Sequence, residues 1–288
     1  MKNINVRDTM IKLGNMPEEE RLRFIEDLCT ANGIFAYRQG NEFFNNNDFF
    51  TITNLIIPAK VQKDKIILTA HYDVIPGSFG YNDNLSGVIT LILLAGEVAD
   101  NVEIVFCDKE ESGYKGASYY IFKNNYNIKM NINVDIVGIP GMIYFTSYPT
   151  YKKSTKPIAY KQNNNKNFYS QGTRQYSCLV DNDAGFTYYD YSKGVIDKEV
   201  IMPITEETVE IVHLPFNDSK AFDKHNIPSV IIMSGPDVTK AKNIDGAFLS
   251  AVMQYQHNGP KDNNIELISE DNIKKIASFV QDIIKENN

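Results

Sequence analysis

Residues 65–107 read KIILTAHYDVIPGSFGYNDNLSGVITLILLAGEVADNVEIVFC, and they predict a buried strand, a buried helix and a second buried strand in succession. Lys65–Ala70 and Val102–Cys107 are short apolar runs bounded by polar residues, as is typical of strands covered on both faces. Asn84–Ala99 lies between them and is mainly apolar over a helical length. Alternation of buried strands with helices indicates an α/β fold.

The same alternation continues toward the C-terminus. Ile132–Val137 and Ser229–Met233 are further apolar runs that we expect to be strands. Ser269 can cap a final helix, whose apolar stripe is Ile273, Ile276, Phe279, Val280 and Ile283. We therefore predict a three-layer α/β/α sandwich with a central mixed, mostly parallel sheet.

Toward the N-terminus, Pro17 and the acids that follow it suit a helix start, and Gly33 suits its end. Phe49–Pro58 is rich in β-forming residues, and a turn-like segment at Gln62–Asp64 separates it from Lys65–Ala70. We expect these two runs to be neighbouring strands.

The middle of the chain interrupts this pattern. Gly141–Val212 is rich in tyrosine and contains short β-like pieces around a polar stretch at 162–167. We predict that residues 1–288 form one domain and that 141–212 is an insertion within it.

Composition excludes several classes of function. A net charge of -7 argues against a nucleic-acid partner, which requires a basic surface. The longest apolar run, Val88–Ala95, is too short to span a membrane. Cys29, Cys107 and Cys178 are widely spaced and odd in number, which fits a reducing compartment. The first residues carry no apolar run typical of a secretory signal, so we expect a cytoplasmic protein.

Acids and a histidine follow the predicted strands, where open α/β sheets usually place their sites. His71 and Asp73 lie two apart on an extended segment, so Asp73 can orient the imidazole of a metal ligand. Asp83 comes just before the buried helix, and a simple helix cap is the alternative reading.

Two more acidic positions follow the later strands. Glu110 and Glu111 lie in Asp108–Gly113, the segment immediately after Val102–Cys107, where a solvated turn is the ordinary alternative. Asp135 lies at the end of a very apolar strand, and a buried carboxylate is costly unless it is paired or binds a metal.

In this order, the motifs His71-Tyr72-Asp73, Asn82–Gly87, Glu110-Glu111 and Asn133–Asp135 resemble those of a zinc aminopeptidase family. That family includes bacterial leucyl aminopeptidases, glutamate carboxypeptidase and, more distantly, glutaminyl cyclases. The resemblance covers Ile66–Ile283 apart from the middle segment. It implies the zinc-exopeptidase fold and two zinc ions per chain.

The resemblance also implies a role for each matching residue. His71 would bind one zinc and be oriented by Asp73, and Asp83 would bridge the two ions. Glu110 matches the general base, and Glu111 matches a ligand of the other zinc.

Two ligand positions remain. Asp135 matches the carboxylate that partners the histidine of the first motif. The last ligand in the family is a histidine ahead of the C-terminal helix, and His257 occupies that place, with one extra residue before Asp262. His213 and His225 compete for this role, although His225 precedes a strand and is expected to be exposed.

The sequence departs from the family at Asn217–Phe222. Ser219 replaces a histidine that is not a metal ligand in the family, and Asn226 replaces a glycine. These changes should leave the metal centre intact and bear on substrate positioning.

The resemblance implies removal of N-terminal residues from peptide substrates by a metal-activated water. The alternatives are a glutaminyl cyclase with a single zinc, a carboxypeptidase for which Arg174 could bind the substrate carboxylate, and a scaffold protein without catalysis.

Overall fold

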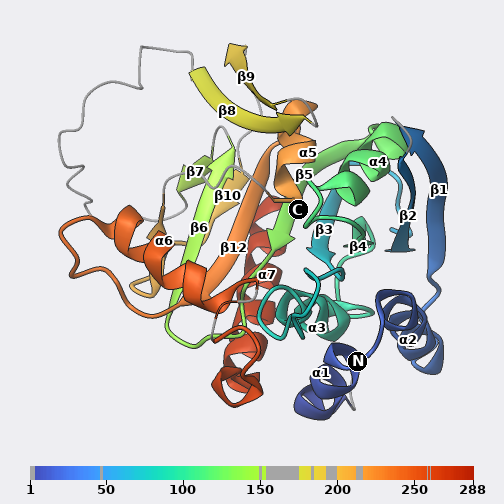
Figure 1. Cartoon of the computed structure of the whole chain (residues 1–288), viewed down its shortest axis with the longest axis horizontal. Helices are drawn as coiled ribbons and strands as arrows, with labels where there is room; N and C mark the ends of the chain where they lie inside the picture. The colour runs from blue at the N-terminus through green and yellow to red at the C-terminus, as the bar shows by residue number, and fades with distance from the viewer. Residues whose placement is uncertain are drawn as a thin grey trace.

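An eight-stranded mixed sheet forms the centre of the computed structural model (Figure 1), which describes residues 4–45, 48–148, 151–153, 175–182, 185–192, 200–211, 217–257, 259 and 261–288. In spatial order the strands are β1 (Tyr37–Asn45), β2 (Asp48–Ile57), β4 (Val102–Cys107), β3 (Lys65–His71), β5 (Ile128–Val134), β12 (Ser229–Gly235), β6 (Met142–Tyr148) and β11 (Thr208–Glu210).

Four adjacent strands, β4, β3, β5 and β12, run parallel at the middle of the sheet. β2 and β6 flank them and pair antiparallel with β4 and β12. The predicted mixed, mostly parallel sheet is confirmed. Its parallel strands are continuous apolar runs because both faces are covered.

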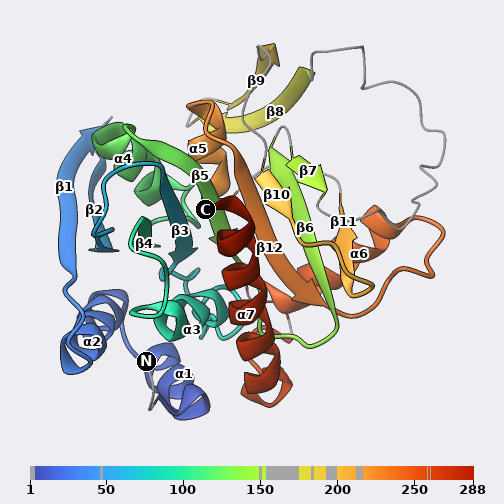
Figure 2. The same cartoon turned by 180° about the vertical axis from the view of Figure 1, so that it is seen from behind.

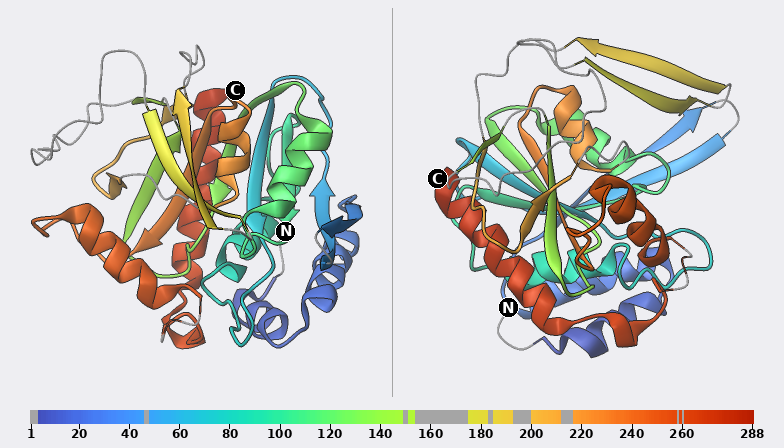
Figure 3. Two further views of the ribbon diagram at one scale, coloured as in Figure 1. Left: turned by 45° about the horizontal axis from the view of Figure 1, so that its top comes forward. Right: turned by 90° about the vertical axis from the view of Figure 1, so that its left-hand side faces the viewer.

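Helices cover both faces of the sheet. One layer contains α1 (Val6–Gly14), α2 (Glu18–Ala31), α3 (Leu85–Leu94) and α7 (Glu270–Asn287), and the other contains α4 (Lys115–Asn124), α5 (Ser219–Lys224) and α6 (Ile244–Tyr255). Alternate residues of β12 face the two layers. Val230 and Ile232 pack in the core on the face covered by α1, α2, α3 and α7, whereas Ile231 packs in a core on the other face. Figure 2 shows α7 lying across the sheet, and Figure 3 shows α4 and α5 on the opposite side.

The predicted helices are present with adjusted bounds. Ser269 caps α7 by accepting a hydrogen bond from the Asn272 N–H, and the predicted apolar stripe of this helix is buried. α2 follows Pro17, as expected. α3 is shorter than predicted and ends at Leu94, because Ala95 is extended and Gly96 adopts a φ of 84°. A short 3-10 helix, η1 (Ile265–Leu267), precedes α7.

The expected pairing of β2 with β3 is wrong. β4 lies between them, parallel to β3 and antiparallel to β2. The βαβ connection through α3 places β4 directly beside β3, and β5 occupies the other edge of β3. β2 therefore pairs with the outer edge of β4.

The range 141–212, which we predict as an insertion, contains two strands of the main sheet, β6 and β11. Between them, β7 (Tyr151–Lys153) pairs with β10 (Val200–Met202), and β8 (Gln175–Asn182) pairs with β9 (Gly185–Ser192). The insertion stays a prediction for the residues between β6 and β11. In the described part of the chain, no helix is both long and apolar enough to cross a membrane.

Candidate metal centre

The predicted site residues meet at the carboxyl ends of the parallel strands. His71 is the last residue of β3, and Asp135 directly follows β5. Glu110 and Glu111 follow β4, while Asp83 lies just before α3. Parallel neighbours end at the same edge of a sheet, so four sequence-distant segments converge there.

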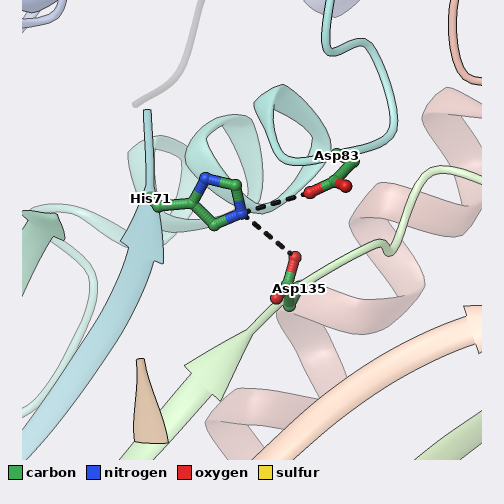
Figure 4. A group of neighbouring side chains, drawn as sticks. All are labelled: His71, Asp83 and Asp135. Carbon is green, nitrogen blue, oxygen red and sulfur yellow. Dashed lines mark ion pairs between the residues drawn. The ribbon is translucent and has the colours of Figure 1, made fainter. Parts of the chain in front are cut away.

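His71, Asp83 and Asp135 form a buried group at this edge (Figure 4). His71 Nε2 lies 3.2 Å from Asp83 Oδ1 and 3.6 Å from Asp135 Oδ1. Among the described residues, neither His71 Nε2 nor Asp135 Oδ1 has a hydrogen-bond partner. A buried nitrogen and a buried oxygen without such partners fit a site for a cation between them.

A second group shares Asp83 with the first. His257 Nε2 lies 3.2 Å from Glu111 Oε2 and 3.7 Å from Asp83 Oδ2. Asp83 therefore turns one carboxylate oxygen toward each histidine. The second group is the more open one, because 47% of the His257 side chain is exposed compared with 1% of the His71 side chain.

Asp73 connects His71 with the acidic loop after β4. His71 Nδ1 lies 3.1 Å from the Asp73 carbonyl oxygen and 3.4 Å from its Oδ1. The two carboxylate oxygens accept hydrogen bonds from the N–H groups of Glu110 and Glu111, at 3.0 and 3.2 Å. Asp73 thus fixes the imidazole and the backbone of both glutamates at once.

The turn that carries Asp83 is bonded to the segment that carries Asp135. Asn84 Nδ2 donates to the Val134 carbonyl, and Asn82 Oδ1 accepts the Gly138 N–H. Ser86 Oγ accepts the Val137 N–H. The Asn84 side chain also accepts the Gly87 N–H and so caps α3. The cap in this motif therefore belongs to Asn84, which leaves the Asp83 carboxylate for the site.

Three residues at the site have a backbone conformation that side chains rarely adopt. Lys109, Ile136 and His257 have φ values of 56°, 54° and 52°. Lys109 and Ile136 are each next to a predicted site residue, and His257 is itself one. Such strain persists where surrounding contacts impose it, as happens at functional sites.

The electrostatics of the two groups favour a bound cation. Burial opposes protonation of His71, but three neighbouring carboxylates, led by Asp135, hold its pKa well above the ordinary value. The contact with Glu111 raises the pKa of His257 to about 9. Burial raises the pKa of both Glu111 and Asp135. Without metal, protons neutralise this excess of buried acids.

Glu110 lies in the same electrostatic field. Burial raises its pKa well above the ordinary value, with the charges of Asp218, Asp135 and Asp73 adding to the effect and that of His71 opposing it. A buried carboxyl group with a raised pKa beside the candidate cation site suits a role in proton transfer.

The family model of peptidase family M28 matches residues 53–283. The chain belongs to peptidase family M28. The predicted resemblance is thereby confirmed at the level of the family.

Relatives of this M28 chain include aminopeptidase YwaD of Bacillus subtilis (strain 168), which is 33% identical over 105 residues, 33% of this chain and 23% of that protein. Two solved structures are similar in fold, each with a TM-score of 0.61. One is a glutaminyl cyclase of Porphyromonas gingivalis, which is 14% identical and matches 98% of this chain and 97% of its own. The other is an aminopeptidase from Aneurinibacillus sp. strain AM-1, which is 12% identical and matches 98% of this chain and 93% of its own. The chain spans 22% and 23% of the length of the curated relatives it matches.

The rival residues fall outside the candidate metal centre or outside the described residues. His225 is exposed at the end of α5. His213 and Arg174 lie outside the described residues. Of the three candidate histidines, His257 is the one that the structure places against Glu111 and Asp83.

The two departures from the family pattern have local explanations. The backbone N–H and the hydroxyl of Ser219 both donate to Asn217 Oδ1, so this side chain is used within its own turn. Asn226 has a φ of 59°, a conformation that glycine adopts freely and asparagine tolerates.

Two buried acids near the candidate metal centre are not singled out as site residues by the sequence. Burial raises the pKa of Asp218 and of Asp262 to about 7. Asp262 Oδ1 accepts the N–H groups of Asn82 and Asp83, at 3.1 and 3.0 Å. Its position in the motif after His257 is the signal that could have identified it.

Proposed function

We propose that this M28 peptidase is an aminopeptidase that holds two zinc ions and hydrolyses the N-terminal peptide bond of peptides. The observation that carries the proposal is the pair of ligand groups that share Asp83. One group adds His71 and Asp135, and the other adds Glu111 and His257.

The residues of both groups fit zinc. Within each group the ligand atoms lie within 4.8 Å of one another. Imidazole nitrogens and carboxylate oxygens are common zinc ligands, and thiolates are not required. Among the described residues, Glu111 Oε1, like the orphaned atoms of His71 and Asp135, is buried without a hydrogen-bond partner. When bound, zinc would supply Lewis acidity at the substrate carbonyl and lower the pKa of a bound water.

The chain's own residues account for the proton transfers. Glu110 would accept a proton from the attacking water and deliver it to the leaving amine. Asp73 would keep Glu110 in place through the Glu110 N–H, which lies 3.0 Å from Asp73 Oδ1. The more open group, with the half-exposed His257, would face the substrate. No covalent intermediate is needed for this route.

A comparison of substrates tests the proposal. The purified protein is assayed with aminoacyl-nitroanilides, with the same compounds acetylated at the amine, and with peptides blocked at the C-terminus. We expect hydrolysis of free-amine and C-blocked substrates, loss of activity on acetylated ones, and inhibition by a chelator. Preference for substrates with a free C-terminal carboxylate would show a carboxypeptidase instead.

A glutaminyl cyclase is the second candidate, because a cyclase and an aminopeptidase match this fold with the same TM-score of 0.61. A peptide that begins with glutamine separates the two activities. Release of free glutamine supports the aminopeptidase, whereas loss of ammonia with the peptide left intact identifies the cyclase.

A further inference from the structure

The turn before α3 and the segment after α6 are joined by a buried set of hydrogen bonds. Ser78 Oγ lies 2.6 Å from Asp262 Oδ2, to which it donates, and 3.2 Å from the His257 carbonyl oxygen. The Gly80 N–H donates to the same hydroxyl at 2.9 Å. Two segments more than 170 residues apart in sequence are thus held together through one serine side chain.

Asp262 bonds to the backbone of the shared ligand itself. Its Oδ1 accepts the N–H groups of Asn82 and Asp83, while Oδ2 accepts the Ser78 hydroxyl. The Asp262 side chain and the Asn82 residue are fully buried. Removing the carboxylate would therefore leave two buried N–H groups without partners, which is costly.

His257 needs external support for its conformation. Its φ of 52° is unfavourable for a side chain with a Cβ atom. Both of its backbone polar groups are near the turn before α3: the N–H donates to Asp83 Oδ2 at 3.0 Å, and the carbonyl oxygen faces Ser78 Oγ. The conformation that presents the imidazole is thus imposed by this turn.

We propose that Ser78 and Asp262 are positioning residues that hold Asp83 and His257 in ligand geometry before an ion binds. The proposal rests on the proposed function for the identity of the ion. We call this pair of residues the Ser78–Asp262 clamp. It acts most directly on the open group, which includes Glu111, and reaches the group of His71 and Asp135 only through the shared Asp83.

The first experiment uses the full chain without metal. Amide hydrogen exchange at Asp83 and His257 is measured by NMR in the parent protein and in S78A, D262A and D262N. We expect both amides to exchange about tenfold faster or more in D262A, and the His257 amide to do so in S78A. D262N keeps one acceptor oxygen and should fall between D262A and the parent.

Glu103→Gln is the matched control for loss of stability. Glu103 is also a buried acid with three partners, since it accepts from the Ala59 N–H, pairs with Lys65 and accepts the Tyr120 hydroxyl. It lies at the other end of β4 from the site. This variant should destabilise the fold without a selective effect on Asp83 and His257.

The second experiment measures zinc binding to the same proteins. We expect the variants of the clamp to weaken the ion of the open group by about 10–100-fold, as is common when supporting residues of a metal site are removed. The other ion should be weakened less, because the clamp reaches its group only through Asp83. S78A removes only a hydroxyl group, so it tests the positioning role of the clamp even if D262A does not fold. Partial rescue by D262N further supports positioning.

The clamp and the proposed function fail in different ways. If the parent protein binds no zinc, the proposed function is wrong, and the exchange rates without metal still decide the clamp. Unchanged exchange at Asp83 and His257 in both S78A and D262A would overturn the clamp. The clamp would also be overturned if E103Q and D262A lost the same stability and the same zinc affinity.

Discussion

At the scale of single residues, Asp83 and Glu110 have different proposed roles, metal binding and proton transfer. Asp83 turns one oxygen toward each of the two proposed ligand histidines, so we assign it to metal binding. Glu110 has no place in either ligand group, yet its pKa is raised by burial within the same cluster. Metal binding and proton transfer can therefore be separated by mutation.

Glu110→Gln tests this division. We expect the variant to keep its zinc, because Glu110 is in neither ligand group, and to lose about 10²–10⁴-fold in kcat through the loss of the general base. Metal analysis and steady-state kinetics measure the two effects. Glu111→Gln is the control and should lose an ion. Turnover near the parent level in the Glu110 variant would reject this residue as the base.

Proton competition at His257 gives a pH dependence. Its pKa without metal is raised to about 9, chiefly by Glu111, so the imidazole is protonated at neutral pH. Zinc binds neutral imidazole, and it must displace this proton. We expect zinc affinity at this group to rise about tenfold per pH unit between about pH 6 and pH 8 for this proton alone.

Calorimetry in buffers of different ionisation enthalpy measures the protons released. His257→Ala should release fewer of them. An affinity that does not change over this range would show that His257 is not a ligand.

At the scale of elements, the N-terminal helices support the turn that carries Asp83. A Cβ atom on Gly14, at the end of α1, would lie 2.5 Å from Tyr81 Cε1 and 3.2 Å from the Phe79 carbonyl oxygen. Glu18 at the start of α2 forms an ion pair with Lys109, beside the acidic loop. Both contacts come from residues that precede the family match at 53–283.

Gly14→Ala tests this support. Overpacking against Tyr81 costs about 1–3 kcal/mol. The gain in helix propensity, at most about 1 kcal/mol, offsets only part of that cost. We expect a net loss of stability and a weaker zinc affinity, measured by thermal unfolding and metal titration. Gly235→Ala is the matched control, because its Cβ atom would have no neighbour within 4 Å. Equal behaviour of the two variants would contradict a supporting role for α1.

Sequence patterns predicted the bounds of the strands better than they predicted which strands pair with each other. The strands β3, β4 and β12 begin as expected because each is a continuous apolar run. The position of β2 could not be read in the same way, because its apolar residues fit an antiparallel partner on either side. Only the βαβ connection through α3, which places β4 beside β3, excludes the pairing with β3.

At the scale of the whole molecule, the candidate metal centre joins segments from most of the chain. The proposed ligands come from the ends of β3, β4 and β5, from the turn before α3 and from the segment after α6. An unfolded chain does not hold these segments together, so bound zinc would stabilise the native state.

We expect zinc to raise the Tm, since a ligand at 100 times its Kd stabilises by about 2.7 kcal/mol. Thermal unfolding with zinc and with a chelator measures this shift. His71→Ala should show a smaller shift than the parent protein. An identical Tm with zinc and with chelator would contradict a built metal centre.

The residues that chemistry requires could be predicted from the sequence, whereas their supports could not. His71, Asp83, Glu111, Asp135 and His257 follow from motifs that resemble those of the family, and Asp135 also from the cost of a buried carboxylate without a partner. Asp262 and Ser78 are polar residues in loops, where such residues are common. Their role depends on a contact across 184 positions that no local pattern encodes.

The most direct test of the account is the zinc content of the parent protein, His71→Ala and His257→Ala, measured by mass spectrometry of the native proteins. Two ligand groups that share Asp83 predict two ions in the parent protein and one in each variant. Asp83→Ala should bind neither ion firmly. A single ion in the parent protein, lost in His257→Ala and kept in His71→Ala, would contradict the two-metal centre and favour a one-metal enzyme of the same fold.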